Sequence, residues 1–281
     1  IITENMANQF FGMFWGRQDV YAKRSVNKGT GKAAYYPQCN NLWTSGCHRK
    51  LKDGINCKDC KSRSYKTITK FIILNHLQGN SYNGSDVIGV YPLFSNGTCR
   101  FMVFDFDNHD KGAEENDFEN VDDTWIEEVE AMREICVLNG IDPLVERSRS
   151  GKGAHIWIFF DKPIAASLVR KFGFALLDKG AEQVNLKSFK YYDRMLPAQD
   201  SLSDNSSLGN LIALPLQGKA LQDGNSAFID GNWNAYPDQW RILFSKPRLS
   251  QEFLEEKIKE WTNPIEDIVA DADESDREKP W

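Results

Sequence analysis

The sequence lacks any run of about 18 apolar residues, the length at which a membrane-spanning helix becomes a candidate. It also lacks an opening segment of positive charge followed by an apolar stretch, the pattern of a secretory signal. These two absences predict a soluble, cytoplasmic protein with no membrane partner. No internal repeat or sustained heptad is present, which excludes a solenoid and a coiled coil. The chain begins at Ile1 without a methionine, so we expect an excerpt or processed product with neighbouring domains.

What the chain does have is an uneven distribution of charge. Its net charge over 281 residues is −6, which by itself argues against a nucleic-acid partner. Residues 1–104, however, hold 14 Lys and Arg against 5 Asp and Glu, whereas residues 105–134 hold 2 against 13. The basic N-terminal third therefore indicates a polyanion partner, with an ordinary basic surface as the alternative.

The segment FFGMFWGRQDVYAKRS combines aromatic and basic residues. Aromatic faces stack on bases and cations contact phosphates, although aromatic residues at this density are also common in cores. The nucleic-acid contacts predicted here are Arg17, Tyr21, Lys23 and Arg24.

Four of the six cysteines lie within 22 residues: Cys39, Cys47, Cys57 and Cys60, of which the last two form a CxxC pair. The surrounding segment is poor in apolar residues, so it needs a cross-link to stabilise its fold. Zinc bound by thiolates supplies such a cross-link in a reducing compartment. His48 is an alternative ligand, and disulfide bonds or a redox CxxC are the alternatives to zinc. Cys99 and Cys136 lie among apolar residues and are predicted to be buried and unreactive.

The strongest local pattern is FMVFDFD, from Phe101 to Asp107. Side chains alternate along a strand, so the two aspartates share one face, with Cα atoms about 6.5 to 7 Å apart. Carboxylates at that spacing suit a pair of cations about 3.5 to 4 Å apart. The alternative is an amphipathic strand whose last residues are simply solvated.

The remaining periodicity predicts helices over residues 65–77, 124–139, 165–183 and 251–261. Strands are predicted over residues 143–148, 188–196 and 226–230. Two apolar runs, residues 86–93 and 99–107, flank the turn sequence SNGT and predict a β-hairpin. The acidic residues 112–123 predict a loop.

A glycine-bearing turn, SRSGKGAH, leads into another apolar strand that carries His155. Gly151 and Gly153 permit backbone conformations that allow close approach to phosphate, and Ser150 and Lys152 offer hydrogen-bond donors. It is not a Walker loop, because the GKG sequence precedes a strand rather than opening a helix.

In this order the motifs resemble the catalytic core of the archaeo-eukaryotic primase superfamily. The resemblance is closest to the primase-polymerase modules of TOTE conflict systems and of CRISPR-associated proteins. It rests on FWGRQDVYAKR, YPQCNNLW, CKDC, DVIGVYPL, FDFD, SGKGAHIWIFF, YDRMLPAQD, GNLIALPLQGKA, GNSAFID and YPDQW, which span residues 11–240.

The resemblance implies roles for individual residues. Asp105 and Asp107 match its first motif, and Asp193, with Asp200 in reserve, matches the third carboxylate that helps to hold two Mg²⁺ or Mn²⁺ ions. The implied nucleotide-binding residues are Ser150, Gly151, Lys152, Gly153, His155 and Lys219. His155 is also counted with the catalytic residues. Arg147 and Arg149 are predicted to contact template or phosphate, or else to lie on a solvated strand edge.

The fold implied is α+β: an antiparallel sheet like that of an RNA-recognition motif, with packed helices, plus an N-terminal α/β module. The expected division is a basic module over residues 1–100 with a zinc knuckle at about 36–64, a catalytic core over 101–246, and a helix with an acidic linker over 247–281. In TOTE proteins such a module precedes a helicase, so a fused or associated helicase is an expected partner.

The activity implied is templated transfer of nucleotides from NTP or dNTP to a 3′-hydroxyl on single-stranded DNA, including primer synthesis, in DNA replication or antiviral conflict. RNA is the alternative template. Three other functions compete with it: a non-catalytic, zinc-containing single-strand-binding module, an end-filling polymerase that does not prime, and a metal-dependent phosphohydrolase.

Overall fold

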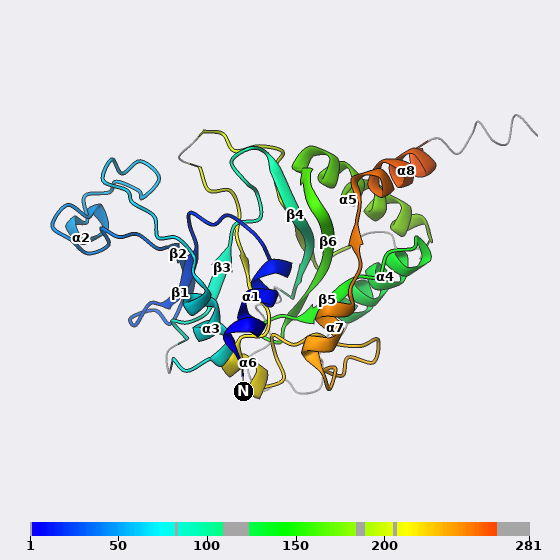
Figure 1. Ribbon diagram of the computed structural model, residues 1–281, viewed down its shortest axis with the longest axis horizontal. Helices are drawn as coiled ribbons and strands as arrows, with labels where there is room; N and C mark the ends of the chain where they lie inside the picture. Colours follow the sequence, from blue (N-terminus) through cyan, green and yellow to red (C-terminus); the bar gives the residue numbers. More distant parts are fainter. Residues whose placement is uncertain (1, 82–83, 109–123, 184–188, 205–206, 263–281) are drawn as a thin grey trace, which may run out of the picture.

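The computed structural model describes residues 2–81, 84–108, 124–183, 189–204 and 207–262 (Figure 1). Two β-sheets form its centre. The predicted acidic loop at 112–123 and the acidic linker after residue 262 lie outside the described residues.

The larger sheet has β4 as an inner strand. Its spatial order is β5-β6-β4-β7, each strand antiparallel to its neighbour, and β9 pairs in parallel with β6. The strands are β4 (Thr98–Asp107), β5 (Leu144–Arg147), β6 (Gly153–Ala165), β7 (Tyr192–Leu196) and β9 (Arg248–Leu249). This antiparallel sheet with packed helices confirms the predicted α+β class.

The side chains of β4 alternate between two hydrophobic cores. Met102, Phe104 and Phe106 belong to one cluster and Phe101 and Val103 to the other, and all five are fully buried. The first cluster includes residues of α4 (Thr124–Leu138), α5 (Ala166–Gln183) and α8 (Gln251–Thr262). The second includes residues of α1 (Glu4–Met13), α3 (Lys70–Gln78) and α7 (Gln239–Ser245). The period of two read from FMVFDFD is therefore confirmed.

The smaller sheet joins strands from distant parts of the chain. Its order is β2-β1-β3-β8, with antiparallel pairing throughout. The strands are β1 (Ala22–Val26), β2 (Ala33–Pro37), β3 (Ile88–Val90) and β8 (Ile212–Ala213). Because β8 follows β4 to β7 in sequence, the N-terminal residues and the predicted core share one sheet.

The predicted hairpin between residues 86–93 and 99–107 is wrong. The turn itself forms, since the Phe94 amide donates to the Thr98 carbonyl at 2.8 Å. However, β4 already has β6 on one side and β7 on the other, so it offers no edge to β3. The strand predicted at 226–230 is reduced to isolated bridges at Phe228 and Ile229.

Helix predictions agree more closely with the structure. The helices α4, α5 and α8 match their predicted ranges to within a residue at each end. The helix expected from residue 65 begins only at Lys70, because Tyr65 bridges to Cys39 and the Thr69 hydroxyl caps the helix by accepting from the Ile72 amide. The short helices α2 (His48–Leu51) and α6 (Gly218–Gln222) have no predicted counterpart.

Residues 39–65 form a projection beside β2, at the left of Figure 1, which we call the cysteine lobe. It contains α2. No helix among the described residues has the length and hydropathy needed for a bilayer crossing.

Candidate active site

A pocket lies where the aspartate-bearing end of β4 meets the turn before β6. The β4–β6 register places Asp105 opposite His155 and Asp107 opposite Gly153. The polar part of the lining consists of Tyr35, Asp105, Asp107, Ser148, Arg149, Ser150, His155 and Arg194. The structure thus brings the DxD strand and the SGKGAH turn together in one site.

His155 lies between two carboxylates. Its Nε2 is 3.5 Å from Oδ1 of Asp105, and its Nδ1 is 2.8 Å from Oε2 of Glu146. Burial disfavours the charged ring, but the two carboxylates outweigh it and raise the pKa of His155 to about 10. Burial likewise opposes ionisation of Asp105, yet His155 and Arg194 hold the pKa of that carboxyl below its ordinary value.

Glu146 is buried beneath His155, with 1% of its surface exposed. Its Oε2 also accepts a hydrogen bond from Nε1 of Trp157 at 2.9 Å, and its Oε1 accepts one from the Ser226 hydroxyl at 3.5 Å. A buried carboxylate needs such partners. These contacts fix Glu146, and through it the ring plane of His155 facing Asp105.

Arg194 bridges two of the predicted acidic residues. Its Nε is 3.3 Å from Oδ2 of Asp105 and 3.1 Å from Oδ2 of Asp193. In the β4–β7 register Arg194 lies opposite Asp105 and Tyr192 opposite Phe106, so Asp193 is the extra residue of a β-bulge. The bulge places Asp193 beside the pocket.

Asp200, the reserve for the third carboxylate, lies elsewhere. It pairs with Arg170, and its carbonyl oxygen lies next to Gly97, which precedes the first residue of β4. At about 3.3 Å per residue, about 23 Å of strand separates Thr98 from Asp105. The arrangement therefore favours Asp193 as the third acid.

The turn before β6 is held by its own backbone. The Gly151 amide donates to the Ser148 carbonyl at 3.0 Å, and Gly151 has a φ of +76° that suits glycine. A Cβ at Gly153 would lie 2.3 Å from the Phe106 carbonyl oxygen. The second glycine is thus required by contact with β4, whereas the sequence had suggested contact with phosphate.

A second pocket adjoins the first and shares Arg149 with it. Its lining includes three cationic side chains, Arg24, Arg149 and Lys219, with Asp223 as the acidic member. Burial and the neighbouring charge of Arg149 both lower the pKa of Arg24. Cations that repel one another in a pocket next to the aspartates favour a polyanionic ligand.

The carboxylates fit divalent ions by donor type, because Mg²⁺ and Mn²⁺ prefer carboxylate oxygens. In the described part of the chain, no three His, Cys, Asp or Glu side chains are grouped closely enough to hold a metal. Arg194 instead contacts both Asp105 and Asp193. An ion shared by these two acids would take over the charge that Arg194 now supplies.

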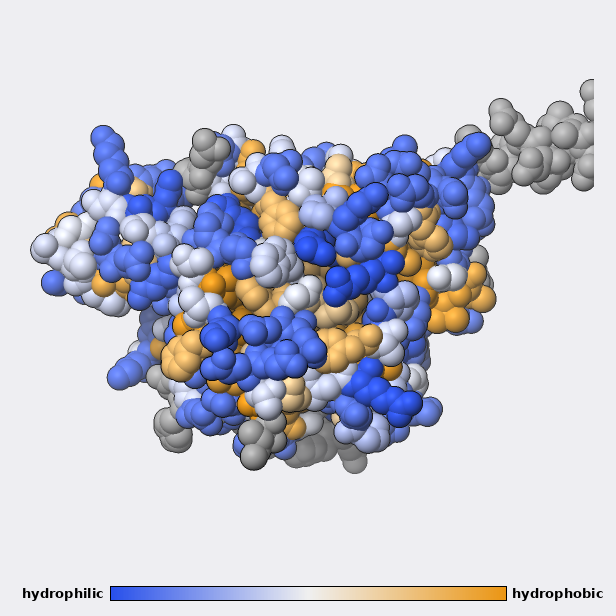
Figure 2. All heavy atoms as spheres, in the orientation of Figure 1, coloured by the Kyte–Doolittle hydropathy of each residue, from blue (hydrophilic) through white to orange (hydrophobic). Residues whose placement is uncertain are grey.

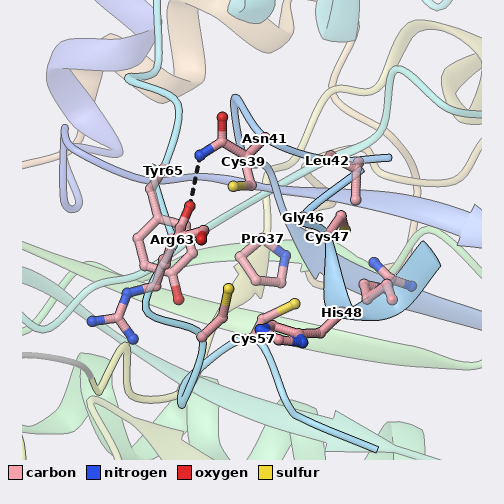
Figure 3. Close-up of a pocket in the computed structure, with 13 residues that line it drawn as sticks. Pro37, Cys39, Asn41, Leu42, Gly46, Cys47, His48, Cys57, Arg63 and Tyr65 are labelled. Carbon is pink, nitrogen blue, oxygen red and sulfur yellow. Dashed lines mark hydrogen bonds between the residues drawn. The ribbon is translucent and has the colours of Figure 1, made fainter. Parts of the chain in front are cut away.

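The four cysteines of the cysteine lobe line one pocket together with His48 (Figure 3). All six cysteines of the chain are free, which is evidence against disulfides. The four lobe cysteines do not form a preassembled metal centre among the described residues. Cys99 and Cys136 are buried as predicted, and burial raises the pKa of each thiol to about 12.

Two predicted nucleic-acid contacts lie in the interior. Arg17 is 8% exposed and its guanidinium binds Asp19, while Tyr21 is 3% exposed. Nucleic acid does not reach side chains placed there. Arg147 donates to the carbonyls of Gly224 and Trp233, which gives it a structural role. Lys23 and Arg24 on β1 are half-buried.

Sequence reasoning missed Glu146, Arg194 and Tyr35. Glu146 could have been found from the sequence, because a glutamate inside the apolar strand sequence PLVER is disfavoured unless it has a buried partner. The other two carried no such signal, since their positions depend on pairing between strands far apart in the chain.

Comparison with known proteins finds one matching family model for this chain. The profile of the TOTE conflict system Archaeo-Eukaryotic Primase domain matches residues 5–257. No curated protein matches the chain. Among solved structures, the chain is similar to the polymerase domain from Mycobacterium tuberculosis Ligase D in complex with DNA, with 15% sequence identity and a TM-score of 0.41. That similarity covers 95% of this chain and 90% of the other.

Proposed function

We propose that this chain, which belongs to the Archaeo-Eukaryotic Primase domain family of the TOTE conflict system, is a primase-polymerase that copies single-stranded DNA. The observation that carries the proposal is the convergence of Asp105, Asp107 and His155 from adjacent strands into one pocket, next to a pocket lined by three cations. A strand end rich in acid beside a cationic pocket matches the two needs of nucleotidyl transfer: metal ligands and triphosphate ligands.

In the proposed reaction a primer 3′-hydroxyl attacks the α-phosphate of a nucleoside triphosphate. A new P–O bond forms, the bond from the α-phosphate to the bridging oxygen breaks, and pyrophosphate leaves while the hydroxyl proton passes to solvent. Asp105, Asp107 and Asp193 would hold two Mg²⁺ or Mn²⁺ ions. When bound, such ions lower the pKa of the attacking hydroxyl and neutralise charge on the leaving group.

The turn and the cation pocket bind the triphosphate in this proposal. Ser150 and Lys152 lie on the turn, Arg149 lines both pockets, and Lys219 lines the second. Fixed donors aimed at the phosphates stabilise negative charge as it develops. Arg24, predicted as a nucleic-acid contact, is reassigned by this proposal to the triphosphate.

His155 acts as a donor to phosphate rather than as a general base. The carboxylates of Glu146 and Asp105 favour its protonated form, and an imidazolium has no lone pair to accept a proton. The ring therefore offers an N–H and positive charge beside the metal ligands.

The cysteine lobe is proposed to bind one structural zinc ion. Four thiols from a segment with little apolar content line one pocket, and their number and type fit tetrahedral zinc. Assembly would need the thiols to draw together, since they are not grouped as a metal centre in the structure. Metal analysis of the purified protein tests this assignment, and Cys57→Ser with Cys60→Ser should abolish zinc binding.

The experiment for the activity is incubation with single-stranded DNA, Mn²⁺ and labelled NTP or dNTP, with and without a primer. Template-dependent incorporation supports the proposal, and incorporation without a primer adds primer synthesis to it. Release of phosphate from nucleotides without incorporation would instead indicate the phosphohydrolase, and binding without either reaction would indicate a non-catalytic module.

A further inference from the structure

Trp43 is the most unusual residue of the cysteine lobe. It is 59% exposed, although tryptophan is one of the largest apolar side chains. Its φ is +66°, a region of backbone conformation that bulky residues rarely adopt because it is strained. The fold therefore holds a large flat ring in solvent at a cost in backbone energy, and such outliers gather at binding sites.

Trp43 belongs to a stack of flat groups. The Arg49 guanidinium carbon lies 4.0 Å from the ring centroid of Tyr36 and 5.9 Å from that of Trp43. Both distances lie within about 6 Å, the range of a cation–π contact, so Arg49 neighbours both rings, and we call these three side chains the stack. Aromatic rings and arginine planes are the surfaces on which unpaired bases stack.

The lobe around this stack is strongly basic. Residues 39–65 hold six Lys and Arg against two Asp and Glu. Figure 2 shows the lobe, at the left, mainly in hydrophilic colours with isolated hydrophobic residues. Leu51 and Ile55 are exposed beside Lys50 and Lys52. A protein partner usually binds a continuous apolar patch, which this surface does not have. Apolar side chains scattered among cations are better suited to binding a polyanion with flat bases.

Strand β2 connects this stack to the candidate active site. Tyr35 lines the catalytic pocket, and the next residue, Tyr36, lies beneath Arg49. Consecutive side chains of a strand point to opposite faces. Tyr35 and Tyr36 therefore face opposite sides of β2, which is the edge strand of its sheet, so a ligand passing from the pocket to the lobe would cross that edge.

We propose that the Tyr36–Arg49–Trp43 stack is a second binding site for single-stranded nucleic acid, in which a base stacks on Trp43 and lobe cations contact the backbone. It rests on the proposed function for its ligand, the template strand, and extends the template's path beyond the catalytic pocket. In this proposal the stack, and not the buried Arg17 and Tyr21, supplies the aromatic and basic contact between the N-terminal third and the nucleic acid.

The test measures binding without catalysis. Fluorescence anisotropy of labelled oligothymidylate, without nucleotides, is compared for the wild-type protein, Trp43→Ala and Trp43→Phe. Trp43→Ala should weaken binding roughly tenfold, within the range known for loss of one stacked base, whereas Trp43→Phe should retain most of the affinity. Phe174→Ala is the matched control, because Phe174 is also exposed and has an arginine, Arg170, 5.5 Å from its ring.

A second variant, Arg49→Gln, tests the same site through charge. It should weaken binding and reduce the dependence of affinity on salt, since the protein then releases fewer counterions from the phosphates. Wild-type affinity in both Trp43→Ala and Arg49→Gln would overturn the inference, as would equal losses in Phe174→Ala. Nucleotide incorporation by the wild-type protein is scored separately, so failure of this site and failure of the proposed activity give different results.

Discussion

Glu146 and His155 form a buried pair in which the carboxylate lies 2.8 Å from Nδ1 of the imidazole. The glutamate is on β5 and the histidine on β6, directly opposite each other in the antiparallel register. Because this contact occupies Nδ1, only Nε2 of the ring faces Asp105 and the pocket. Glu146 thus positions His155 in the pocket without lining the pocket itself.

Glu146→Gln should lower nucleotide incorporation by about tenfold or more, the scale seen when a supporting partner of an active-site histidine is lost. The amide keeps the size of the side chain and an acceptor for Trp157, but it removes the charge beside Nδ1. Steady-state kinetics with a primed template checks this result. Glu130→Gln, on helix α4 and bonded to Arg133, is the matched control and should keep wild-type activity. Equal activity in the two variants would remove the positioning role.

Asp193→Asn should abolish incorporation, whereas Asp200→Asn should leave it nearly unchanged. Asp193 shares Arg194 with Asp105, while Asp200 pairs with Arg170 near the opposite end of β4. Both substitutions preserve side-chain size, so the comparison isolates the carboxylate charge. The reverse pattern would assign the third acid to Asp200.

Arg24→Gln should raise KM for the nucleotide about tenfold, because it removes one of three cations from the second pocket. The effect on kcat should be smaller, since Arg24 lines the second pocket and not the one with the aspartates. Lys28→Gln, an exposed lysine between β1 and β2, is the control. An unchanged KM with weaker template binding would return Arg24 to the role first predicted for it, contact with nucleic acid.

His76 should make the fold less stable in mild acid. Burial lowers the pKa of His76 to about 4, although the Pro215 carbonyl and Asp86 act in the opposite direction. The neutral ring accepts from the Ile88 amide through Nδ1 and donates to the Pro215 carbonyl through Nε2. Because the folded pKa lies below the unfolded value of 6.5, the unfolded chain binds the proton first, and stability is lost as pH falls from 6.5 towards 4.

The loss attributable to His76 is at most about 3.5 kcal/mol, from the difference between 6.5 and about 4 and about 1.4 kcal/mol per unit of pKa. Urea unfolding at several pH values measures it. His76→Gln should reduce the slope of stability against pH in this window. A wild-type slope in His76→Gln would show that other groups cause the acid sensitivity.

Features that depend on local periodicity were predictable from the sequence. The two faces of β4 and the ranges of α4, α5 and α8 follow from alternation and helical spacing within one segment. The motif order also placed Asp105 and His155 in one site, which the β4–β6 register provides. The first two signals lie within single segments, whereas the joint placement of Asp105 and His155, which are far apart in the chain, came from the order of motifs that the family resemblance supplied.

Features set by long-range pairing were not predictable in the same way. The hairpin at SNGT failed because β6 and β7, which follow in sequence, occupy both edges of β4. Arg17 and Tyr21 have the composition of a nucleic-acid contact, but the fold buries them, and it exposes Trp43 instead. Exposure depends on which elements cover a segment, and composition alone does not specify that.

The most direct test of the central claim is metal-dependent incorporation of labelled nucleotide on a primed single-stranded template. It compares the wild-type protein with Asp105→Asn combined with Asp107→Asn, and circular dichroism verifies that both are folded. We predict incorporation by the wild-type protein in the presence of Mn²⁺ and background counts from the double variant, because the two carboxylates at the end of β4 would hold the ions. Wild-type rates in the folded double variant would contradict the account.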